Sequence, residues 1–443
     1  MTFLTGWGRT APTPAHVHRP RTAEALAALV ARGSPRGMVA RGLGRAYGDA
    51  AQNAGGAVID CTALTAWRLD PVTGVVTASA GAALHDLMTG LVPRGWFPPV
   101  TPGTRFVTVG GAVAADVHGK NHHVDSSFGA HLRSITLITA DGETRVLRPG
   151  DPLFWATVGG MGLTGVIAEA EFACVPVETS RMVVDVQRTA DLDETLAVMA
   201  DTDRHHRYTV AWIDLLARGG RAGRGVLTRG DHARRTDLKG APGDPLAFAP
   251  RTRLAAPAHL PGGLLNPLTV RAFNEAWYRR APRLRHGVVQ GIAPFFHPLD
   301  SVAGWNRVYG PRGFVQYQFV VPDGREETLR RIVERLSARG VVSFLTVLKR
   351  FGPGTPAPLS FPMPGWTLAL DIPAARPGLD GLLRVFDEWV AEAGGRVYLA
   401  KDSRLRADMT SAMYPRLSEW REVRDGVDPG GVFRSDLARR LDL

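Results

Sequence analysis

Residues 41–49 read Arg-Gly-Leu-Gly-Arg-Ala-Tyr-Gly-Asp and follow a short apolar run, Met38 to Ala40. Glycines let a backbone approach a ligand closely, and consecutive N–H groups in such a turn can bind an anion. Two more glycine-rich stretches follow, Pro102 to Gly111 and Gly159 to Gly165. One such loop is a weak signal, whereas three within the first 170 residues indicate a site that binds a pyrophosphate.

The second and third loops are joined by a segment of small residues. It runs Gly110-Gly-Ala-Val-Ala-Ala-Asp-Val-His118-Gly-Lys120. Side chains this small suggest a backbone that lies flat against a large planar group.

Helix and strand signals alternate around these loops. Thr22 can cap a helix that ends at Gly33, and Leu84 to Leu91 carries apolar residues at helical spacing. Val76 to Ala80 and Val166 to Val175 have the alternating, β-branched character of strands. The first third of the chain is therefore predicted to mix helices with a sheet.

One motif in this region is misleading. Gly160-Met-Gly-Leu-Thr-Gly165 has the letter pattern of a dinucleotide-binding turn. That interpretation requires a helix after the motif, but Val166 to Val175 is strand-like. We therefore expect no NAD site here, while a flavin-binding loop in another fold stays open.

Bulk composition restricts the class of protein. The chain has 443 residues, a formal net charge of +11 and two cysteines. That length favours two or three domains, and two cysteines exclude a disulfide framework or a cysteine-based metal site. The positive charge is compatible with an anionic partner and equally with a surface that is merely solvated. No apolar run is long enough to span a membrane, and the first nine residues lack the apolar core of a signal peptide.

The middle of the chain has a different character. Strand-like runs at 207–214, 314–321 and 366–372 alternate with helical stretches, whereas 217–263 is rich in Arg, Gly and Pro. We predict a second domain over 181–393 with a mobile surface loop near 217–263, and a C-terminal segment, 394–443, that ends in a helix.

Two glutamines suggest a polar binding surface. Alternate residues of a strand share a face, so Gln316 and Gln318 point the same way. Each amide both donates and accepts hydrogen bonds, which suits a hydroxyl-rich sugar. An ordinary solvent-exposed sheet face would show the same pattern.

Taken together, the motifs resemble a known family. The stretch at 41–49, Pro102-Gly-Thr, Thr108-Val-Gly-Gly and His118-Gly-Lys-Asn-His-His are similar to the vanillyl-alcohol-oxidase type of FAD-binding domain, also called PCMH-type. Within that group the chain most resembles the decaprenylphosphoryl-β-D-ribose 2′-oxidases. The likeness continues, in the same order, through Phe154-Trp-Ala-Thr, His297-Pro-Leu-Asp, Gln316-Tyr-Gln-Phe, Leu359-Ser-Phe-Pro, Lys401-Asp-Ser-Arg and Met413-Tyr-Pro-Arg.

The resemblance implies an α+β fold with FAD as cofactor. The fold would combine a two-lobed FAD-binding domain, residues 1–180, with a substrate domain built on an antiparallel sheet, and residues 394–443 would return to the FAD domain. It places the FAD phosphates on 41–49 and 108–111. The implied flavin-binding residues are Arg41, Gly42, Leu43, Gly44, Arg45, Ala46, Tyr47, Gly48, Asp49, Gly103, Thr108, Val109, Gly110, Gly111, Ala115, Asp116, Val117, His118, Ile167 and Tyr398.

Arg45 bears on how the flavin is held. Many relatives attach flavin covalently through a histidine at this position of the first loop, and this chain has an arginine there. We therefore predict noncovalent FAD.

The resemblance also assigns roles on the substrate side. A lysine acts as a base only if burial or a nearby cation lowers its pKa, and Lys401 is the first candidate for this role, with His118 as the alternative. The implied substrate-binding residues are Lys120, Trp212, Gln316, Gln318, Lys349, Ala369 and Asp371. No metal site is expected.

Four positions depart from the family pattern. Ala369 stands where the best-known members have the cysteine that nitroaromatic inhibitors trap, so such trapping should fail here. Phe296 replaces a tyrosine, Thr346 an asparagine and Leu348 a phenylalanine. We expect all four changes to lie around the pocket, where they affect the substrate rather than the type of reaction.

The implied reaction is oxidation of the 2′-hydroxyl of a polyprenylphosphoryl-β-D-ribose to a 2′-keto sugar. An NAD(P)H-dependent reductase would complete the epimerisation to the arabinose form, and oxygen or a quinone would reoxidise the flavin. We expect a cytoplasmic or periplasmic enzyme that is peripheral to the inner membrane, with the arginines of 217–263 as one electrostatic contact and with no nucleic-acid partner. Two alternatives stay open, namely an oxidase of soluble alditols or aldonolactones and a non-catalytic flavin- or glycolipid-binding protein.

Overall fold

The first strands of the chain form a small, mostly parallel sheet in the order β1-β2-β4-β3. The computed structural model describes residues 1–240, 243–257 and 261–443. Helix α1 follows β2, and as predicted Thr22 caps its first turn while Gly33 ends it. The bounds are β1 Thr2–Leu4, β2 Thr13–His18, α1 Ala23–Arg32, β3 Met38–Arg41 and β4 Ala57–Asp60.

A second, antiparallel sheet of five strands has the order β5-β6-β10-β8-β9. The predicted strands at 76–80 and 166–175 are β6 and β10, and the predicted helix at 84–91 is α2. Because Gly160–Gly165 leads into strand β10 and not into a helix, the rejection of a dinucleotide-binding turn is confirmed. The bounds are β5 Trp67–Leu69, β6 Val75–Ser79, α2 Leu84–Leu91, β7 Trp96–Phe97, α3 Val109–Ala114, α4 His122–Asp125, β8 Leu132–Ile138, β9 Thr144–Leu147, α5 Pro152–Thr157, β10 Val166–Ala173 and β11 Val175–Pro176.

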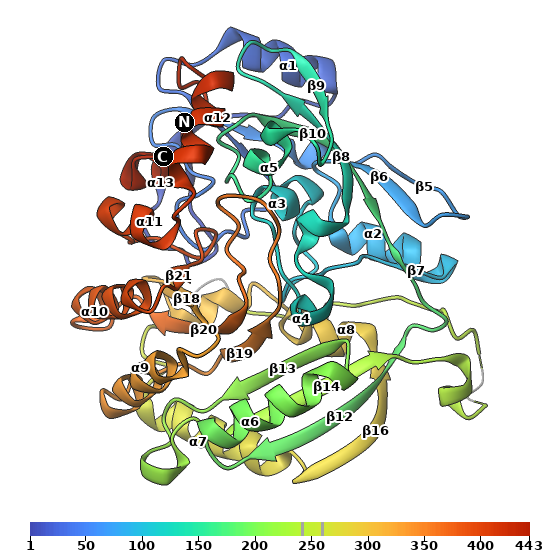
Figure 1. Cartoon of the computed structure of the whole chain (residues 1–443), viewed down its shortest axis with the longest axis vertical. Helices are drawn as coiled ribbons and strands as arrows, with labels where there is room; N and C mark the ends of the chain where they lie inside the picture. The colour runs from blue at the N-terminus through green and yellow to red at the C-terminus, as the bar shows by residue number, and fades with distance from the viewer. Residues whose placement is uncertain (241–242, 258–260) are drawn as a thin grey trace.

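A third sheet crosses the other end of the molecule (Figure 1). Its eight strands are antiparallel and have the order β16-β12-β14-β13-β19-β20-β18-β21. One face is covered by α6, α9 and α10, and the apolar side chains between them form the largest core of the protein. The bounds are β12 Arg181–Thr189, α6 Leu192–Thr202, β13 Tyr208–Ile213, β14 Gly225–His232, β16 Leu284–Gly291, β18 Phe314–Pro322, α9 Glu326–Ala338, β19 Thr346–Phe351, β20 Gly365–Pro373, α10 Leu379–Glu392 and β21 Arg396–Val397.

The prediction of one long loop over 217–263 was wrong. Strand β14 lies inside that range and pairs with β12 on one side and β13 on the other. Its arginine suits an interior strand because Arg229 donates to Thr202 and Gln187. Arg224 is likewise buried and is paired with Asp214, so neither arginine faces a membrane.

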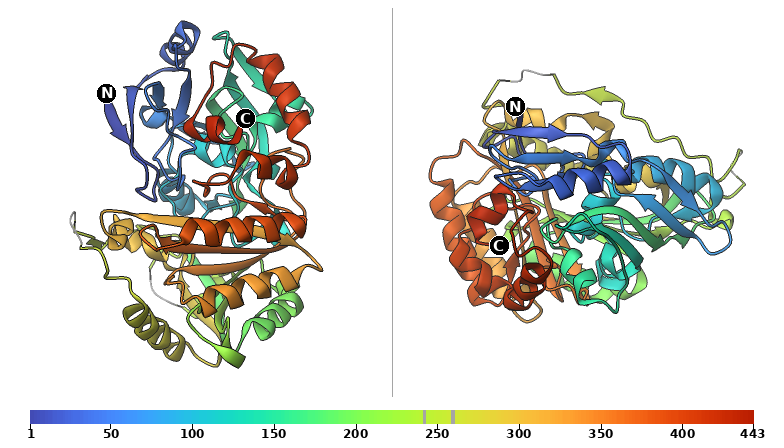
Figure 2. Two further views of the ribbon diagram at one scale, coloured as in Figure 1. Left: turned by 90° about the vertical axis from the view of Figure 1, so that its left-hand side faces the viewer. Right: turned by 90° about the horizontal axis from the view of Figure 1, so that it is seen from above.

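The C-terminal residues lie against the first two sheets. A β-bridge joins Phe433 to Met38, and the Trp420 indole donates to the carbonyl of Ala156 at 2.9 Å. Figure 2 shows these last helices beside the N-terminal strands. Instead of the single final helix predicted, there are three: α11 Ala407–Met413, α12 Leu417–Val427 and α13 Asp436–Leu441.

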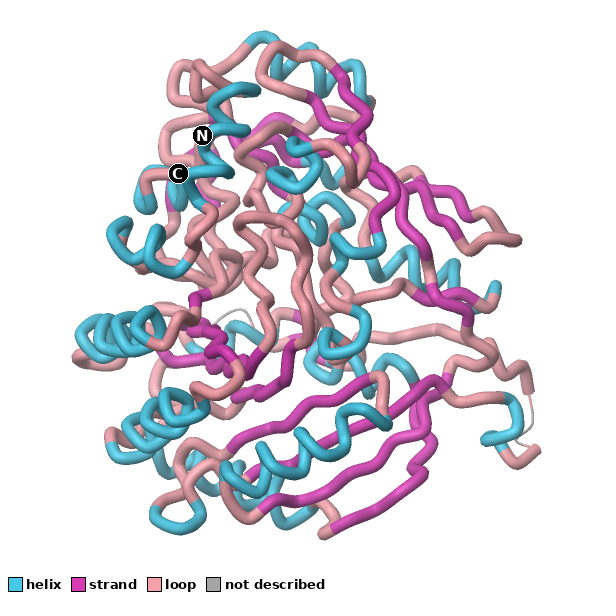
Figure 3. The backbone as a smooth tube through the Cα atoms, viewed as in Figure 1, coloured by secondary structure: helices cyan, strands magenta, loops and turns pink. Residues whose placement is uncertain are grey.

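The space between the large sheet and the two smaller sheets is crossed mainly by loops, drawn in pink in Figure 3. Loops at this junction carry the glycine-rich stretches of the sequence and face the uncovered side of the large sheet. The remaining elements flank this junction and the outer edge of the sheet. They are β15 Leu254–Ala255, α7 Pro267–Arg280, α8 Ile292–Phe296 and β17 Val302–Ala303.

Candidate active site

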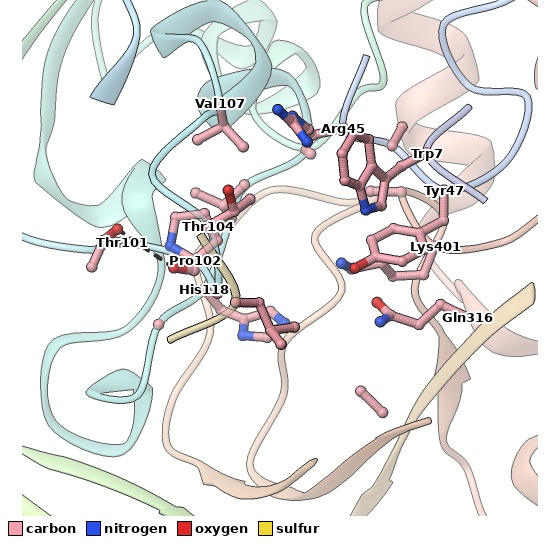
Figure 4. A pocket seen from close by; sticks show the side chains of 18 of the residues that line it. Trp7, Arg45, Tyr47, Thr101, Pro102, Thr104, Val107, His118, Gln316 and Lys401 are labelled. Carbon is pink, nitrogen blue, oxygen red and sulfur yellow. Dashed lines mark hydrogen bonds between the residues drawn. The ribbon is translucent and has the colours of Figure 1, made fainter. Parts of the chain in front are cut away.

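A cavity of about 690 Å³ lies at this junction. One wall is formed by the glycine-rich loops of the first 165 residues, and the opposite wall by side chains of the large sheet. Figure 4 shows Tyr47, Gln316 and Lys401 gathered on one side, with His118 facing them across the cavity. The site is therefore built by segments that are far apart in the sequence.

The first loop presents its backbone to the cavity. Gly42 passes so close to Thr108 that a Cβ there would lie 2.2 Å from the Thr108 hydroxyl, and Gly44 has a φ of +65°, which favours glycine. Among the described residues, the backbone N–H groups of 43–46 have no acceptor in the protein. Unpaired N–H groups along a cavity wall fit the pyrophosphate of FAD.

The Arg41 side chain supports this loop from behind. Its guanidinium donates to the carbonyls of Ala51 and Thr5 at 2.9 and 2.7 Å. These bonds tie the guanidinium to the backbone just after the loop and to the N-terminal segment, so the structure gives Arg41 a supporting position.

Residues 108–111 were expected to bind the FAD phosphates, but most of their N–H groups form other hydrogen bonds. The N–H groups of Val109 and Gly110 donate to Ala82 and Ala80, and that of Gly111 donates to the Thr108 hydroxyl. These three N–H groups are already bonded inside the protein and are not free to bind a phosphate. Gly110 and Gly111 instead give the cavity a wall without side chains, which fits a flat ring system.

Arg45 occupies the position of the attachment histidine. Its guanidinium lies 3.8 Å from the centre of the Trp7 ring and donates to the Phe106 carbonyl at 3.1 Å. Burial lowers the pKa of Arg45, while Asp300 opposes that effect. An arginine held in this way offers no nucleophile for a covalent bond to flavin.

Lys401 follows the last strand of the large sheet. Strand β21 ends at Val397, so Lys401 lies in a turn and not at the strand end that the sequence suggested. Its ammonium lies 3.9 Å from the centre of the Tyr47 ring. Burial lowers the Lys401 pKa to about 7, and the charge of Asp371 opposes this shift. Within the described part of the chain, Lys401 forms no ion pair.

Asp371 lies behind the cavity wall next to Lys401. Gln316 donates to one oxygen of its carboxyl group at 2.5 Å, and the Tyr309 hydroxyl donates to the other at 3.3 Å. Burial raises the Asp371 pKa well above the usual range of aspartate. This network fixes the orientation of the Gln316 amide in the cavity wall.

His118 is enclosed on both sides of its ring. The Gln318 amide lies 3.0 Å from Nε2, and the Lys349 ammonium lies 2.8 Å from Nδ1. Burial, followed by the Lys349 charge, keeps the His118 pKa well below its ordinary value. His118 is therefore a neutral ring with both nitrogens engaged, which leaves Lys401 better placed to accept a proton.

Two further predicted substrate residues lie along the same cavity. Lys120 donates to the Phe295 carbonyl, and burial lowers its pKa to about 7. The Trp212 indole donates to the Phe344 carbonyl at 3.0 Å while its ring lines the cavity. Lys120 and Lys349 thus add two amine groups to this wall.

Most of the predicted site residues line this one cavity; besides Asp371, which lies behind its wall, four do not. Gly48 packs against the carbonyl of Asp402, and Val109 is in a core. Asp49 pairs with Arg440, and Asp116 accepts from Ser127, Thr355 and Ser360. The residues that line the cavity are Arg41, Gly42, Leu43, Gly44, Arg45, Ala46, Tyr47, Gly103, Thr108, Gly110, Gly111, Ala115, Val117, His118, Lys120, Ile167, Trp212, Gln316, Gln318, Lys349, Ala369, Tyr398 and Lys401.

The sequence analysis missed several lining residues. Gly162 and Gly165 of the misleading motif face the cavity, as do Trp7 and the edge residues Trp277 and Arg280. The glycine content of 159–165 was a usable signal. Trp7 carried no local signal, because its contacts with the site are to residues far from it in the sequence, such as Arg45 and Ala46.

Two of the four departures from the family pattern are not in the pocket. Val347 and Lys349 line the cavity, so Thr346 and Leu348, at the alternate positions of β19, point to the opposite face and are buried in the core. Phe296 and Ala369 do line it. The expected change of pocket shape is therefore confined to these two positions.

Comparison with known proteins identifies the family. Residues 14–148 match the model of an FAD binding domain, and residues 325–441 match that of D-arabinono-1,4-lactone oxidase. The chain is 47% identical to decaprenylphosphoryl-β-D-ribose oxidase of Mycolicibacterium smegmatis over 449 residues, which cover 99% of this chain and 97% of that protein. The chain belongs to this oxidase family.

More distant relatives align with this chain over nearly their full length. L-gulono-1,4-lactone dehydrogenase of Mycobacterium tuberculosis is 25% identical over 98% of this chain and 97% of its own. Alditol oxidase of a Streptomyces species is 25% identical over 99% of both chains. The protein is accordingly an FAD-dependent oxidoreductase with an α+β fold, as the sequence predicted.

Proposed function

We propose that this oxidase removes two electrons from the 2′-hydroxyl carbon of a polyprenylphosphoryl-β-D-ribose. The proposal is supported by the relative at 47% identity, whose name specifies that sugar. The observation that carries it is the polar corner of the cavity, where Lys401 and Gln316 lie together (Figure 4) and where Gln318, next to His118, also lines the wall. Two amides can orient sugar hydroxyls, and a half-buried lysine that has no ion pair among the described residues can accept a proton.

Lys401 is the proposed base. Its lowered pKa leaves a substantial fraction of neutral amine near pH 7, and a base is most efficient when its pKa lies near the working pH. Bound FAD supplies the hydride acceptor that the amino acids lack. Gln316 is held by Asp371, and His118 is held between Gln318 and Lys349, so the surrounding groups are fixed before substrate binds.

The phosphate of the substrate has a matching environment. Lys120 and Lys349 both line the cavity, and the charges of Lys401 and Lys120 lower the Lys349 pKa further after burial has lowered it. An anion placed among mutually repelling lysines would favour their charged forms. This pair of lysines is therefore the proposed phosphate contact.

FAD is proposed to be noncovalent, because Arg45 stacks on Trp7 at the usual point of attachment. Precipitating the purified protein with acid should release all the yellow colour into the supernatant. Flavin that stays with the precipitate would contradict this proposal.

The function is tested by anaerobic mixing with a polyprenylphosphoryl-β-D-ribose. The flavin absorbance should be lost, and the product should be the 2′-keto sugar. An unchanged spectrum would count against this substrate. Bleaching by free alditols or aldonolactones alone would favour the soluble-sugar alternative. The match of residues 325–441 to a lactone oxidase supports that alternative.

The remaining parts of the proposal concern partners and location. An NAD(P)H-dependent keto-reductase would use the product, and oxygen or a quinone would reoxidise the flavin. None of the helices in the described residues is long and apolar enough to cross a bilayer. We propose a peripheral attachment to the inner membrane, where a polyprenyl phosphate resides.

A further inference from the structure

Helix α7 exposes apolar side chains at the outer edge of the large sheet. Leu268 is 77% exposed, Phe273 45% and Trp277 48%, and the last two rings stack with their centres 6.3 Å apart. Ala272 and Ala276 are exposed between them. These five residues are here called the α7 face. An exposed apolar surface that includes two aromatic rings is unusual for a protein with no partner.

The surroundings of the α7 face are strongly basic. From Leu264 to Gln290 the chain has one acidic residue, Glu275, and that residue is paired with Arg224 and Arg279. Its exposed arginines are Arg271, Arg279, Arg280, Arg283 and Arg285. Apolar residues flanked by arginines are the composition of a helix that lies in the headgroup region of an anionic bilayer.

The same helix forms one end of the cavity. Trp277 and Arg280 line it, and so do Val186, Val210 and Val226 on the uncovered face of the sheet. These valines give the end near α7 an apolar wall, whereas the polar corner lies at Lys401. Figure 2 shows α7 at the outer end of the molecule, on the side of the large sheet away from α6.

We propose that the α7 face is a docking surface for an anionic lipid bilayer, and that a lipid chain enters the cavity beside Trp277. The inference rests on the proposed function, because it assigns the polyprenyl chain to the apolar end under α7 and the sugar to the polar corner. Two observations favour a bilayer as the occupant. The surroundings of α7 are positively charged, and the cavity reaches the surface of the protein beside this helix.

The test measures binding of the FAD-loaded protein to phosphatidylcholine vesicles with and without phosphatidylglycerol. Wild type should bind anionic vesicles, and salt should weaken that binding. The double variant Leu268→Ser/Phe273→Ser should bind about tenfold more weakly, because two apolar side chains lose their burial in the membrane. The matched control is Phe3→Ser/Val72→Ser, which removes apolar groups that are 72% and 86% exposed elsewhere.

Charge is tested separately. Arg283→Gln/Arg285→Gln should lower binding to anionic vesicles by about fivefold for each arginine removed. Arg148→Gln/Arg335→Gln, which changes two exposed arginines far from α7 in sequence, should have no effect. All variants are checked for an unchanged melting profile and flavin content before the comparison.

Three results would overturn the proposal. The first is that wild type binds neither kind of vesicle, and the second is that the α7 variants bind as well as wild type. The third is that wild type forms a dimer that the α7 variants abolish, which would assign the face to a second copy. Bleaching of the flavin by a detergent-dispersed polyprenylphosphoryl-ribose requires no vesicle. It therefore separates failure of this proposal from failure of the proposed function.

Discussion

Lys401 is the residue on which the proposed chemistry depends most. It lies half-buried against Tyr47 and, among the described residues, has no carboxylate paired with it. Lys401→Met should keep FAD bound but slow anaerobic flavin reduction by about 10²- to 10⁴-fold, the range for loss of a general base. Stopped-flow absorbance measures this directly. The control is Lys239→Met, since Lys239 is exposed outside the cavity; equal rates in the two variants would remove Lys401 from the mechanism.

The pH dependence of flavin reduction follows from the same residue. Only the neutral amine accepts a proton, and burial lowers the Lys401 pKa to about 7. The rate should therefore rise as pH increases through about 7 and then level off. An unperturbed lysine, with a pKa of about 10.4, would instead keep the rate rising to much higher pH. A profile of that second kind, measured under anaerobic single-turnover conditions, would contradict the burial argument.

At the level of elements, α13 joins the first loop to the turn that carries Lys401. Arg440 donates to Asp49, the last residue of the glycine-rich stretch 41–49, and to Asp402, just after Lys401, at 2.8 Å each for its closest contacts. Arg440→Met should lower the free energy of unfolding by about 2 kcal/mol, less than for a fully buried pair because Arg440 is partly exposed. It should also weaken FAD binding.

Urea unfolding and flavin titration measure these two effects. Arg384→Met on α10 is the matched control, because that arginine is exposed. If Arg440→Met changed neither quantity, the pairing with Asp49 and Asp402 would have no role in holding the site.

The sequence identified elements well where the periodicity was local. The α1 cap, the helix at 84–91 and the shared face of Gln316 and Gln318 needed only neighbouring residues. Strand β14 was missed because its arginine finds partners in α6 and β12, far from it in sequence. The prediction that Leu348 lies at the pocket was wrong, because it rested on the family pattern alone. Its neighbours Val347 and Lys349 line the cavity, so the Leu348 side chain points to the opposite face of the strand.

At the scale of the whole molecule, the cavity is shared between the two ends of the structure. The first loop provides N–H groups that have no acceptor in the described part of the chain, and the large sheet provides Gln316 and Gln318 from the opposite side. No local pattern could predict how Trp7, α7 and the turn at Lys401 meet there. The family motifs placed Lys401 in the site, but they did not indicate Trp7 or α7.

FAD bound at this junction should stabilise the whole protein. A ligand that binds only the folded state adds about 4 kcal/mol when its concentration is 1,000 times its Kd. The melting temperature of flavin-free protein should therefore rise with added FAD in a concentration-dependent way, as followed by circular dichroism. Adenosine diphosphate should give a smaller rise, because it reaches only part of the cavity. A melting temperature independent of FAD would contradict noncovalent binding at this site.

The most direct measurement uses polyprenylphosphoryl-ribose labelled with deuterium at C2′. If the enzyme oxidises the 2′-hydroxyl, the C2′–H bond breaks as the flavin is reduced, and the label should slow anaerobic bleaching. The same label at C3′ should leave the rate unchanged. A slower reaction with the C3′ label, or no bleaching with either compound, would contradict oxidation at the 2′ position.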